Sequence, residues 1–165
     1  MKQVSSQSSD HAITMLGINL RGLAMSPERA IENLIYRYAE LIDLGELDAI
    51  GELLSRARFI GPEGEVHAEG SEAILAIYRS FTRLYEDGTP LSHHVTSNLI
   101  IEVEGSAARA RSYFTVFQAT ESLPLQPVIA GRYVDEFACD EAGWYFTSRQ
   151  IIPRLSGDLS QHLNA

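Results

Sequence analysis

An acid at the end of one segment and a histidine pair at the start of another could together carry out proton transfer. Asp43 ends a segment with a helical pattern, and His93 and His94 open a stretch typical of a long strand. A carboxylate in contact with an imidazole fixes the ring tautomer and stabilises the protonated ring, so such a dyad can abstract a proton. A fold that joins these segments inside an apolar cup would suit proton-transfer chemistry on a small hydrophobic molecule.

The segment before Asp43 is predicted to be an amphipathic helix that carries two of the candidate groups. Ser26 is a typical N-cap and Pro27 a typical first helical residue. Apolar residues then recur at three- and four-residue intervals until Gly45, which would close the helix. On a helical wheel Asp43 lies about 100° from the centre of the apolar stripe, so it could also serve only as a junction between helices. Tyr38 lies on the stripe, where it could be a pocket hydroxyl or a core residue.

The strand that begins at His93 leaves open which histidine faces the cup. Strict alternation places His94 and Asn98 on one face, and His93 on the face of the apolar side chains Leu99 and Ile101. If that apolar face packs against the helices, His93 is the pocket residue. A β-bulge would reset the alternation and bring His94 inward instead.

The rest of the pattern predicts an α+β domain. Shorter elements come first: a helix over residues 47–54, a hairpin over 57–69 with its turn at Gly61-Pro62-Glu63-Gly64, and a third helix. Ser71-Glu72 should cap this third helix, Leu84 should lie on its apolar face, and residues 86–90 should end it. Long strands are expected over residues 94–103, 107–121, 128–139 and 144–152.

Helices followed by a meander of long strands should leave a cone-shaped cup between the helices and a strongly curved sheet. We interpret residues 1–25 as a flexible N-terminal arm and residues 26–165 as a single domain.

Composition excludes several classes of function. The net charge of −9 and the lack of a basic cluster disfavour binding to nucleic acids or to anionic membranes. Cys139 is the only cysteine, which excludes a disulfide framework and multi-cysteine metal sites. His67 and Glu69 alone are too few to hold a metal, and no Gly-rich phosphate loop is present. Without an apolar run of about 20 residues or a signal-peptide block, we expect a cytoplasmic protein that uses no cofactor.

The order of these elements and five motifs resemble the SnoaL-like branch of the nuclear transport factor 2-like superfamily. The resemblance runs from about residue 27 to the C-terminus. It implies an NTF2-like, cone-shaped α+β barrel in which three N-terminal helices pack on a strongly curved mixed sheet. Relatives include dehydratases, a dehydrochlorinase, ketosteroid isomerase, polyketide cyclases and dioxygenase small subunits. The motifs are Tyr38-x4-Asp43-x-Gly45-x2-Asp48, His94-x3-Asn98-x2-Ile101-Glu102-Val103-x-Gly105, Gly131-Arg132-Tyr133-x-Asp135-x-Phe137, Trp144-x-Phe146-x2-Arg149 and Gly157-Asp158-Leu159-Ser160-x-His162-Leu163.

The resemblance implies catalytic roles for four side chains. The dehydratase and dehydrochlorinase relatives keep an aspartate, a histidine, an arginine on the last strand, and a tyrosine or lysine, which match Asp43, His94, Arg149 and Tyr38. His94 would abstract a proton while Asp43 fixes its tautomer. Arg149 and Tyr38 would stabilise a developing negative oxygen. The match also favours His94 over its neighbour, because relatives share the four-residue step to the asparagine.

Arg149 could instead form only a surface ion pair with Asp135 or Glu136 on the neighbouring strand. We interpret residues 157–163 as a segment that docks on a neighbouring subunit. The expected substrate-binding side chains are His93, Asn98, Tyr113, Phe81 and Tyr133.

We expect an acid–base enzyme, either a lyase of the dehydratase type or an isomerase, that acts on a small hydrophobic cyclic molecule. One alternative is a non-catalytic protein that binds such a ligand in the same cup. Another is an assembly partner, like the small subunit of a ring-hydroxylating dioxygenase. In each case we expect a homo-oligomer that associates through an apolar outer side of the sheet, with a trimer favoured over a dimer.

Overall fold

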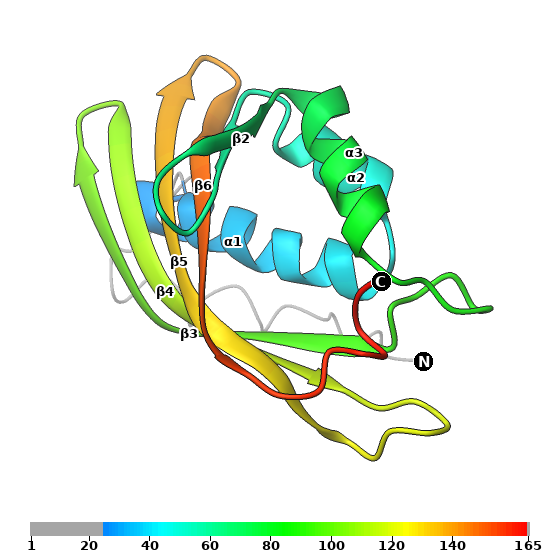
Figure 1. Ribbon diagram of the computed structural model, residues 1–165. Helices are drawn as coiled ribbons and strands as arrows, with labels where there is room; N and C mark the ends of the chain where they lie inside the picture. The colour runs from blue at the N-terminus through cyan, green and yellow to red at the C-terminus, as the bar shows by residue number, and fades with distance from the viewer. Residues whose placement is uncertain (1–24, 165) are drawn as a thin grey trace, which may run out of the picture.

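The computed structural model describes residues 25–164, in which three helices lie within the curve of one six-stranded mixed sheet. Figure 1 shows α1 lying across the concave side of the sheet, with α2 and α3 closing one end. This is the predicted NTF2-like α+β architecture. The edge strands β2 and β3 do not pair, so the sheet is curled and the barrel stays open. The predicted N-terminal arm lies outside the described residues, apart from Met25.

Helix α1 (Pro27–Asp43) has the predicted boundaries. The Ser26 side chain accepts a hydrogen bond from the Arg29 N–H, and Pro27 is the first helical residue. Gly45 follows the helix with a φ of +72°, a left-handed conformation that favours glycine. A Cβ atom at Gly45 would overlap the carbonyl oxygen of Gly88, so the position also has no room for a side chain. The end of α1, which carries Asp43, is therefore held in place by backbone geometry.

The other two helices differ in detail from their predicted boundaries. Helix α2 spans Leu47–Leu53, close to expectation. Helix α3 spans Ser71–Phe81, so Ser71 is its first helical residue and not its cap; Gly70 takes the cap position without a side-chain hydrogen bond. The helix also ends earlier than expected, because Thr82 adopts an extended conformation and forms a β-bridge with Leu163 of the C-terminal segment.

The strands follow the predicted hairpin and meander. All neighbouring pairs are antiparallel except β1 and β6, which are parallel, so the sheet is mixed. The order across the sheet is β2-β1-β6-β5-β4-β3. The strands are β1 (Arg58–Ile60), β2 (Val66–Glu69), β3 (Ser92–Glu104), β4 (Ala107–Gln118), β5 (Gln126–Asp140) and β6 (Gly143–Ser156).

A bulge in β3 decides which of its residues face the helices. The pairing of β3 with β4 shifts between Ser97 and Ile100, and Asn98 has a φ of +52°. Before the bulge the even-numbered His94 is the more buried side chain, whereas after it the odd-numbered Leu99 and Ile101 are. A bulge adds one residue to a strand and so exchanges its two faces. His94 and the later apolar residues therefore share the concave face, which strict alternation forbids.

The convex outer face of the sheet is mixed, and not apolar as expected. Tyr113, Val95 and Ile100 are exposed on it. Between them lie arginines, of which Arg109 approaches Glu136 at 3.9 Å and Arg111 approaches Glu102 at 3.8 Å. Exposed ion pairs of this length add little to stability. None of the helices in residues 25–164 is long and apolar enough to cross a membrane.

Candidate functional site

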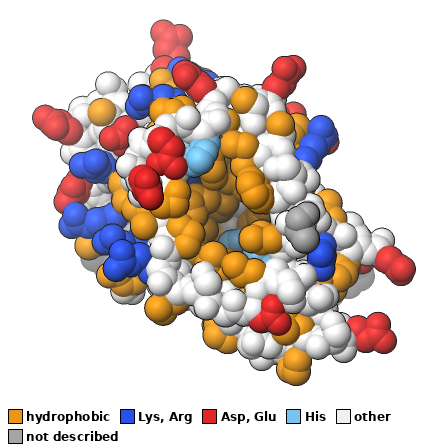
Figure 2. Space-filling model, viewed as in Figure 1, with side chains coloured by type: hydrophobic (Ala, Val, Ile, Leu, Met, Phe, Trp, Pro, Cys, Tyr) orange, Lys and Arg blue, Asp and Glu red, His pale blue; other side chains and the backbone are white. Residues whose placement is uncertain are grey.

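A cavity of about 470 Å³ lies between the helices and the concave face of the sheet, and we call it the inner cavity. Figure 2 shows it as a hollow whose walls are mostly hydrophobic. An apolar cavity of this volume with a few polar groups is typical of small-molecule sites. Its lining residues are Tyr38, Ile42, Phe59, His67, Ile77, Tyr78, Phe81, Thr82, His94, Phe114, Val116, Ile129, Tyr133, Ile151, His162 and Leu163.

Asp43 and His94 meet at the wall of the inner cavity. The Nδ1 atom of His94 lies 2.6 Å from Oδ1 of Asp43, and the two side chains are only 8% and 18% exposed. The Asp43 carboxylate also accepts hydrogen bonds from the His94 backbone N–H at 2.8 Å and from the Ser92 hydroxyl at 3.1 Å. Three donors therefore fix its orientation. A charged acceptor at Nδ1 places the ring proton there, which leaves Nε2 as the free, basic nitrogen.

His93 has a different position from its neighbour. Its side chain is 75% exposed, and its Nδ1 atom lies 3.7 Å from Oδ2 of Asp43. It does not line the inner cavity. Because adjacent residues of a strand point to opposite faces, only one of the two histidines can reach the concave side, and the structure places His94 there.

Two tyrosines bring hydroxyl groups to the same cavity. The Tyr78 hydroxyl donates to the Tyr38 hydroxyl over 2.9 Å, so the hydrogen of Tyr38 remains available to another acceptor. Burial raises the pKa of Tyr38, although the charge of Arg149 and the hydrogen bond from Tyr78 oppose it. Burial also raises the pKa of Tyr78. Both phenols are therefore neutral near pH 7, and Tyr38 can act as a hydrogen-bond donor.

Arg149 lies behind the cavity wall and not in it. Its side chain is fully buried, and its Nε atom lies 3.4 Å from Oδ1 of Asp135, its partner across β5 and β6. The guanidinium carbon lies 3.7 Å from the ring centre of Tyr38 and 4.2 Å from that of Tyr133. Burial raises the pKa of Asp135 to about 6, against the opposing charge of Arg149. The ion pair that was considered at the surface is thus a core pair that supports the two tyrosines.

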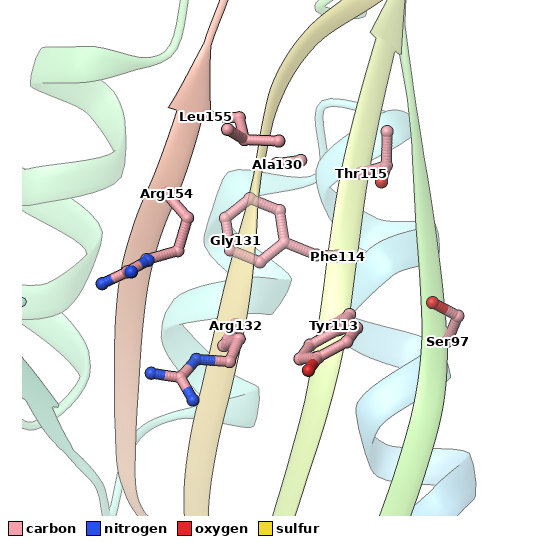
Figure 3. A pocket seen from close by; sticks show the side chains of 9 residues that line it. All are labelled: Ser97, Tyr113, Phe114, Thr115, Ala130, Gly131, Arg132, Arg154 and Leu155. Atoms are coloured by element: carbon pink, nitrogen blue, oxygen red, sulfur yellow. The ribbon is translucent and has the colours of Figure 1, made fainter.

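The expected substrate-binding residues are divided between the two faces of the sheet. Phe81 and Tyr133 line the inner cavity. Tyr113 and Asn98 do not, because Tyr113 points outward from β4 and Asn98 occupies the bulge. Tyr113 instead lines a groove of about 440 Å³ on the outer face, which we call the outer groove. The residues that line it come from β3, β4, β5 and β6, and Figure 3 shows Tyr113 and Arg132 among them.

The sequence pattern did not reveal that Tyr78 and His162 line the inner cavity. Tyr78 lies on α3, and its hydroxyl contact with Tyr38 depends on how α1 and α3 cross. His162 belongs to a C-terminal segment that was expected to dock on another subunit. In the structure this segment folds back onto its own chain, where Leu163 pairs with Thr82. The motif around His162 was the only available signal.

The described part of the chain offers no evident metal site. No three His, Cys, Asp or Glu side chains within residues 25–164 are placed to share a metal ion. His67 pairs instead with Glu65, whose Oε1 lies 2.9 Å from Nε2 of the imidazole. The groups available for chemistry in the inner cavity are therefore imidazoles, a carboxylate and phenols.

Comparisons with known proteins agree with this architecture. Residues 24–150 match the SnoaL-like domain family. The structure resembles an NTF2-like protein with a cystatin-like fold from Novosphingobium aromaticivorans (24% identity, TM-score 0.64, covering 82% of this chain and 86% of that one). It also resembles a protein from the same organism that is provisionally named a scytalone dehydratase (20% identity, TM-score 0.63, covering 79% of this chain and 86% of that one). A third similar structure from this organism is provisionally named the beta subunit of an aromatic-ring-hydroxylating dioxygenase (18% identity, TM-score 0.61, covering 82% of this chain and 95% of that one). The sequence matches none of the curated proteins with which it was compared.

Proposed function

We propose, since this chain belongs to the SnoaL-like domain family, that it is an acid–base enzyme of the dehydratase or isomerase type that needs no cofactor. Its substrate would be a small, hydrophobic cyclic molecule held in the inner cavity. The observation that carries this proposal is the 2.6 Å contact between Asp43 and His94 at the wall of that cavity. A largely buried carboxylate–imidazole pair with one free ring nitrogen is suited to proton abstraction.

In this mechanism Nε2 of His94 removes a proton from a carbon atom of the substrate. The electron pair of the broken C–H bond forms a double bond as the neighbouring C–O bond breaks. The imidazolium then returns the proton to the departing hydroxyl group, which leaves as water. Asp43 stabilises the positive ring throughout, and its own three hydrogen bonds keep it in place. In an isomerase the same proton would return to a different carbon atom.

Tyr38 would bind an oxygen atom of the substrate. Its hydroxyl hydrogen is free because Tyr78 donates to its oxygen, and a neutral phenol can stabilise negative charge that develops on a carbonyl or alkoxide. Arg149 lies behind its ring and would act by positioning it. The apolar walls favour a substrate with few charges. A structural relative named provisionally as a scytalone dehydratase is consistent with water elimination from a cyclic compound.

Removal of either dyad member tests the proposal. The substrates to screen are hydroxylated ring compounds, with loss of water followed by ultraviolet absorbance and mass spectrometry. His94→Ala and Asp43→Asn should each lower kcat/KM by about 10²- to 10⁴-fold, because each removes general-base catalysis. The matched controls are Val95→Ala on the outward side of β3 and Glu40→Gln on the exposed side of α1. The kcat/KM of both controls should stay within about threefold of the wild-type value. Full activity in folded dyad variants would rule the mechanism out.

An assembly role is a second candidate. The fold resembles a provisionally named dioxygenase beta subunit at a TM-score of 0.61, and the outer groove exposes Tyr113 on the convex face of the sheet. Aromatic side chains are enriched at interfaces between proteins. In this alternative the outer face would contact other subunits, with a homotrimer favoured over a dimer. Co-purification with a larger oxygenase subunit, together with no turnover of ring compounds, would favour it.

A further inference from the structure

The C-terminal segment carries a motif that the dyad does not explain. In Gly157-Asp158-Leu159-Ser160-x-His162-Leu163, the Asp158 side chain accepts a hydrogen bond from the Ser160 N–H at 2.9 Å. The Leu159 carbonyl then accepts from the N–H groups of His162 and Leu163 at 2.9 and 3.1 Å. These bonds make a tight turn, which is the kind of local structure that aspartate and serine favour. The turn sets the direction of the His162 side chain.

The same segment is held by the loop that follows α3 and by the end of β4. The Tyr85 hydroxyl donates to the Gln161 carbonyl over 2.7 Å, and the Gln118 side chain donates to that same carbonyl over 2.9 Å. Arg83 donates to the Ser160 carbonyl over 2.8 Å. All three bonds go to backbone carbonyls, so they hold the chain without using the imidazole. The His162 ring is thus held by its backbone and keeps its hydrogen-bonding capacity.

His162 brings another imidazole to the inner cavity, in addition to those of His94 and His67. Its ring lines the cavity, and its ring centre lies 6.4 Å from that of His94. The Nδ1 atom is buried without a hydrogen-bond partner among the described residues. Buried polar atoms without partners are rare in proteins and need an explanation. The charged groups that face this ring are the two members of the dyad, from α1 and β3.

The distance between the two rings fits one oxygen atom between them. Ring nitrogens lie about 1 Å from a ring centre, and two hydrogen bonds of about 2.8 Å each can span nitrogens up to about 5.5 Å apart. Burial, with a smaller effect from His94, lowers the pKa of His162 to about 4. The ring is therefore neutral near pH 7 and offers both a donor and an acceptor, which is what a hydroxyl group requires.

We propose that His162 is a substrate-orienting residue that hydrogen-bonds a hydroxyl group of the ligand in the space between its own ring and the ring of the base His94. The inference rests on the proposed function in taking this cavity as the ligand site. It narrows the substrate class to cyclic compounds that carry a hydroxyl group. A residue with only a packing role would treat hydroxylated and non-hydroxylated ligands alike, and this difference makes the inference testable.

Two probes of similar shape separate these roles: 2-naphthol, which has the hydroxyl group, and 2-methylnaphthalene, which lacks it. Their dissociation constants are measured with the full chain by fluorescence titration. His162→Phe should weaken 2-naphthol by about three- to tenfold, as expected for one lost hydrogen bond, and leave 2-methylnaphthalene unchanged. His162→Gln, which keeps a neutral donor and acceptor, should restore most of the preference. Arg83→Met, which loosens the segment but keeps the imidazole, should not alter the ratio of the two constants.

Each result has a defined meaning. An unchanged ratio in His162→Phe, or equal weakening of both probes, overturns the inference and leaves the proposed function standing. If neither probe binds the wild-type protein, the ligand site itself is wrong, and both proposals fall. If His162→Phe does not fold, ¹⁵N spectra of the wild-type histidines decide. There, 2-naphthol and not 2-methylnaphthalene should shift the ring signals of His162, and no such shift overturns the inference.

Discussion

The carboxylate of Asp43 and the imidazole of His162 are both polar groups beside an apolar cavity, and they differ in how they are hydrogen-bonded. Asp43 receives three hydrogen bonds, which offset the loss of water around its charge. His162 receives none on its ring from the described residues, and burial instead keeps it neutral. The dyad is therefore suited to move a proton, and His162 is suited to bind an uncharged group.

The lowered pKa of His162 makes the stability of the fold depend on pH. In the unfolded chain the imidazole takes up a proton below about pH 6.5, whereas in the folded chain it does so only below about pH 4. Between these values acid favours unfolding. We expect the wild type to lose stability as the pH falls through this window, and His162→Gln to lose less.

Urea unfolding followed by circular dichroism at several pH values measures this effect. Asp135 acts in the opposite sense over much of the same window, because its raised pKa favours the folded chain in acid. The quantity to compare is therefore the difference in the free energy of unfolding between the wild type and His162→Gln at each pH. The contribution of Asp135 is the same in both proteins and cancels in this difference. A difference that does not vary with pH would contradict the prediction.

The elements position the dyad through features at their ends. Helix α1 ends at Asp43, and β3 begins at Ser92, so the junctions after α1 and before β3 must be held close together. Gly45 lies at that junction and contacts the backbone of Gly88 in the loop before β3. The close approach of two backbones, which only glycine permits here, therefore brings the end of the helix to the start of the strand.

Gly45→Ala should destabilise the protein more than a glycine substitution in open space. The new Cβ would overlap the Gly88 carbonyl oxygen, and the residue would have to keep a φ of +72°. We expect a loss of about 2–4 kcal/mol, from the left-handed conformation and the steric overlap together. Gly64→Ala is the control, since Gly64 also has a positive φ, of +95°, but a Cβ there would have no atom within 4 Å. This variant should lose only about 1–2 kcal/mol in the free energy of unfolding. Equal losses in urea unfolding would show that the contact with Gly88 is unimportant.

Removal of one partner of the core ion pair between Arg149 and Asp135 should destabilise the protein more than removal of both charges. Arg149→Met leaves the buried Asp135 without its partner, and we expect a loss of about 3–5 kcal/mol in the free energy of unfolding. The double variant Asp135→Asn with Arg149→Met removes both charges and should recover a large part of that loss. A double-mutant cycle measured by urea unfolding checks this, and purely additive losses would contradict it.

At the scale of the whole molecule, the two faces of the sheet serve different purposes. The concave face and the helices form the inner cavity, whose walls around His94 are mostly apolar (Figure 2). The convex face is open, and it combines the exposed Tyr113 with several arginines. Glutamates such as Glu102 and Glu136 lie beside these arginines, so the convex face offers charges of both signs to another subunit.

If subunits associate through the outer face, a negative charge introduced at the centre of this face should weaken their association. We expect sedimentation velocity to give a multiple of the 18.3 kDa chain mass for the wild type, with a trimer favoured. Tyr113→Glu should shift the species toward the monomer. Tyr36→Glu, at an exposed tyrosine of α1, is the control and should not. A monomeric wild type, or a Tyr113 variant that stays fully assembled, would contradict the prediction.

Much of the fold could be predicted from local patterns, and the dyad from these patterns together with the family resemblance. The caps of α1, its apolar period, the hairpin and the four long strands depend on residues close in the chain, so they are visible in the sequence. The residues alone paired Asp43 with one of two histidines, and the resemblance to the SnoaL-like relatives favoured His94. Asp43 and His94 lie in contact although 51 positions separate them.

What only the tertiary structure decided depends on register and on contacts between distant segments. The bulge at Asn98 settles which face of β3 carries His94, the register of β5 and β6 buries Arg149 with Asp135, and the return of the C-terminal segment brings His162 to the cavity. A shift of one residue in a strand reverses the direction of every side chain after it. Local propensity does not encode such shifts, because they follow from the packing of the whole sheet.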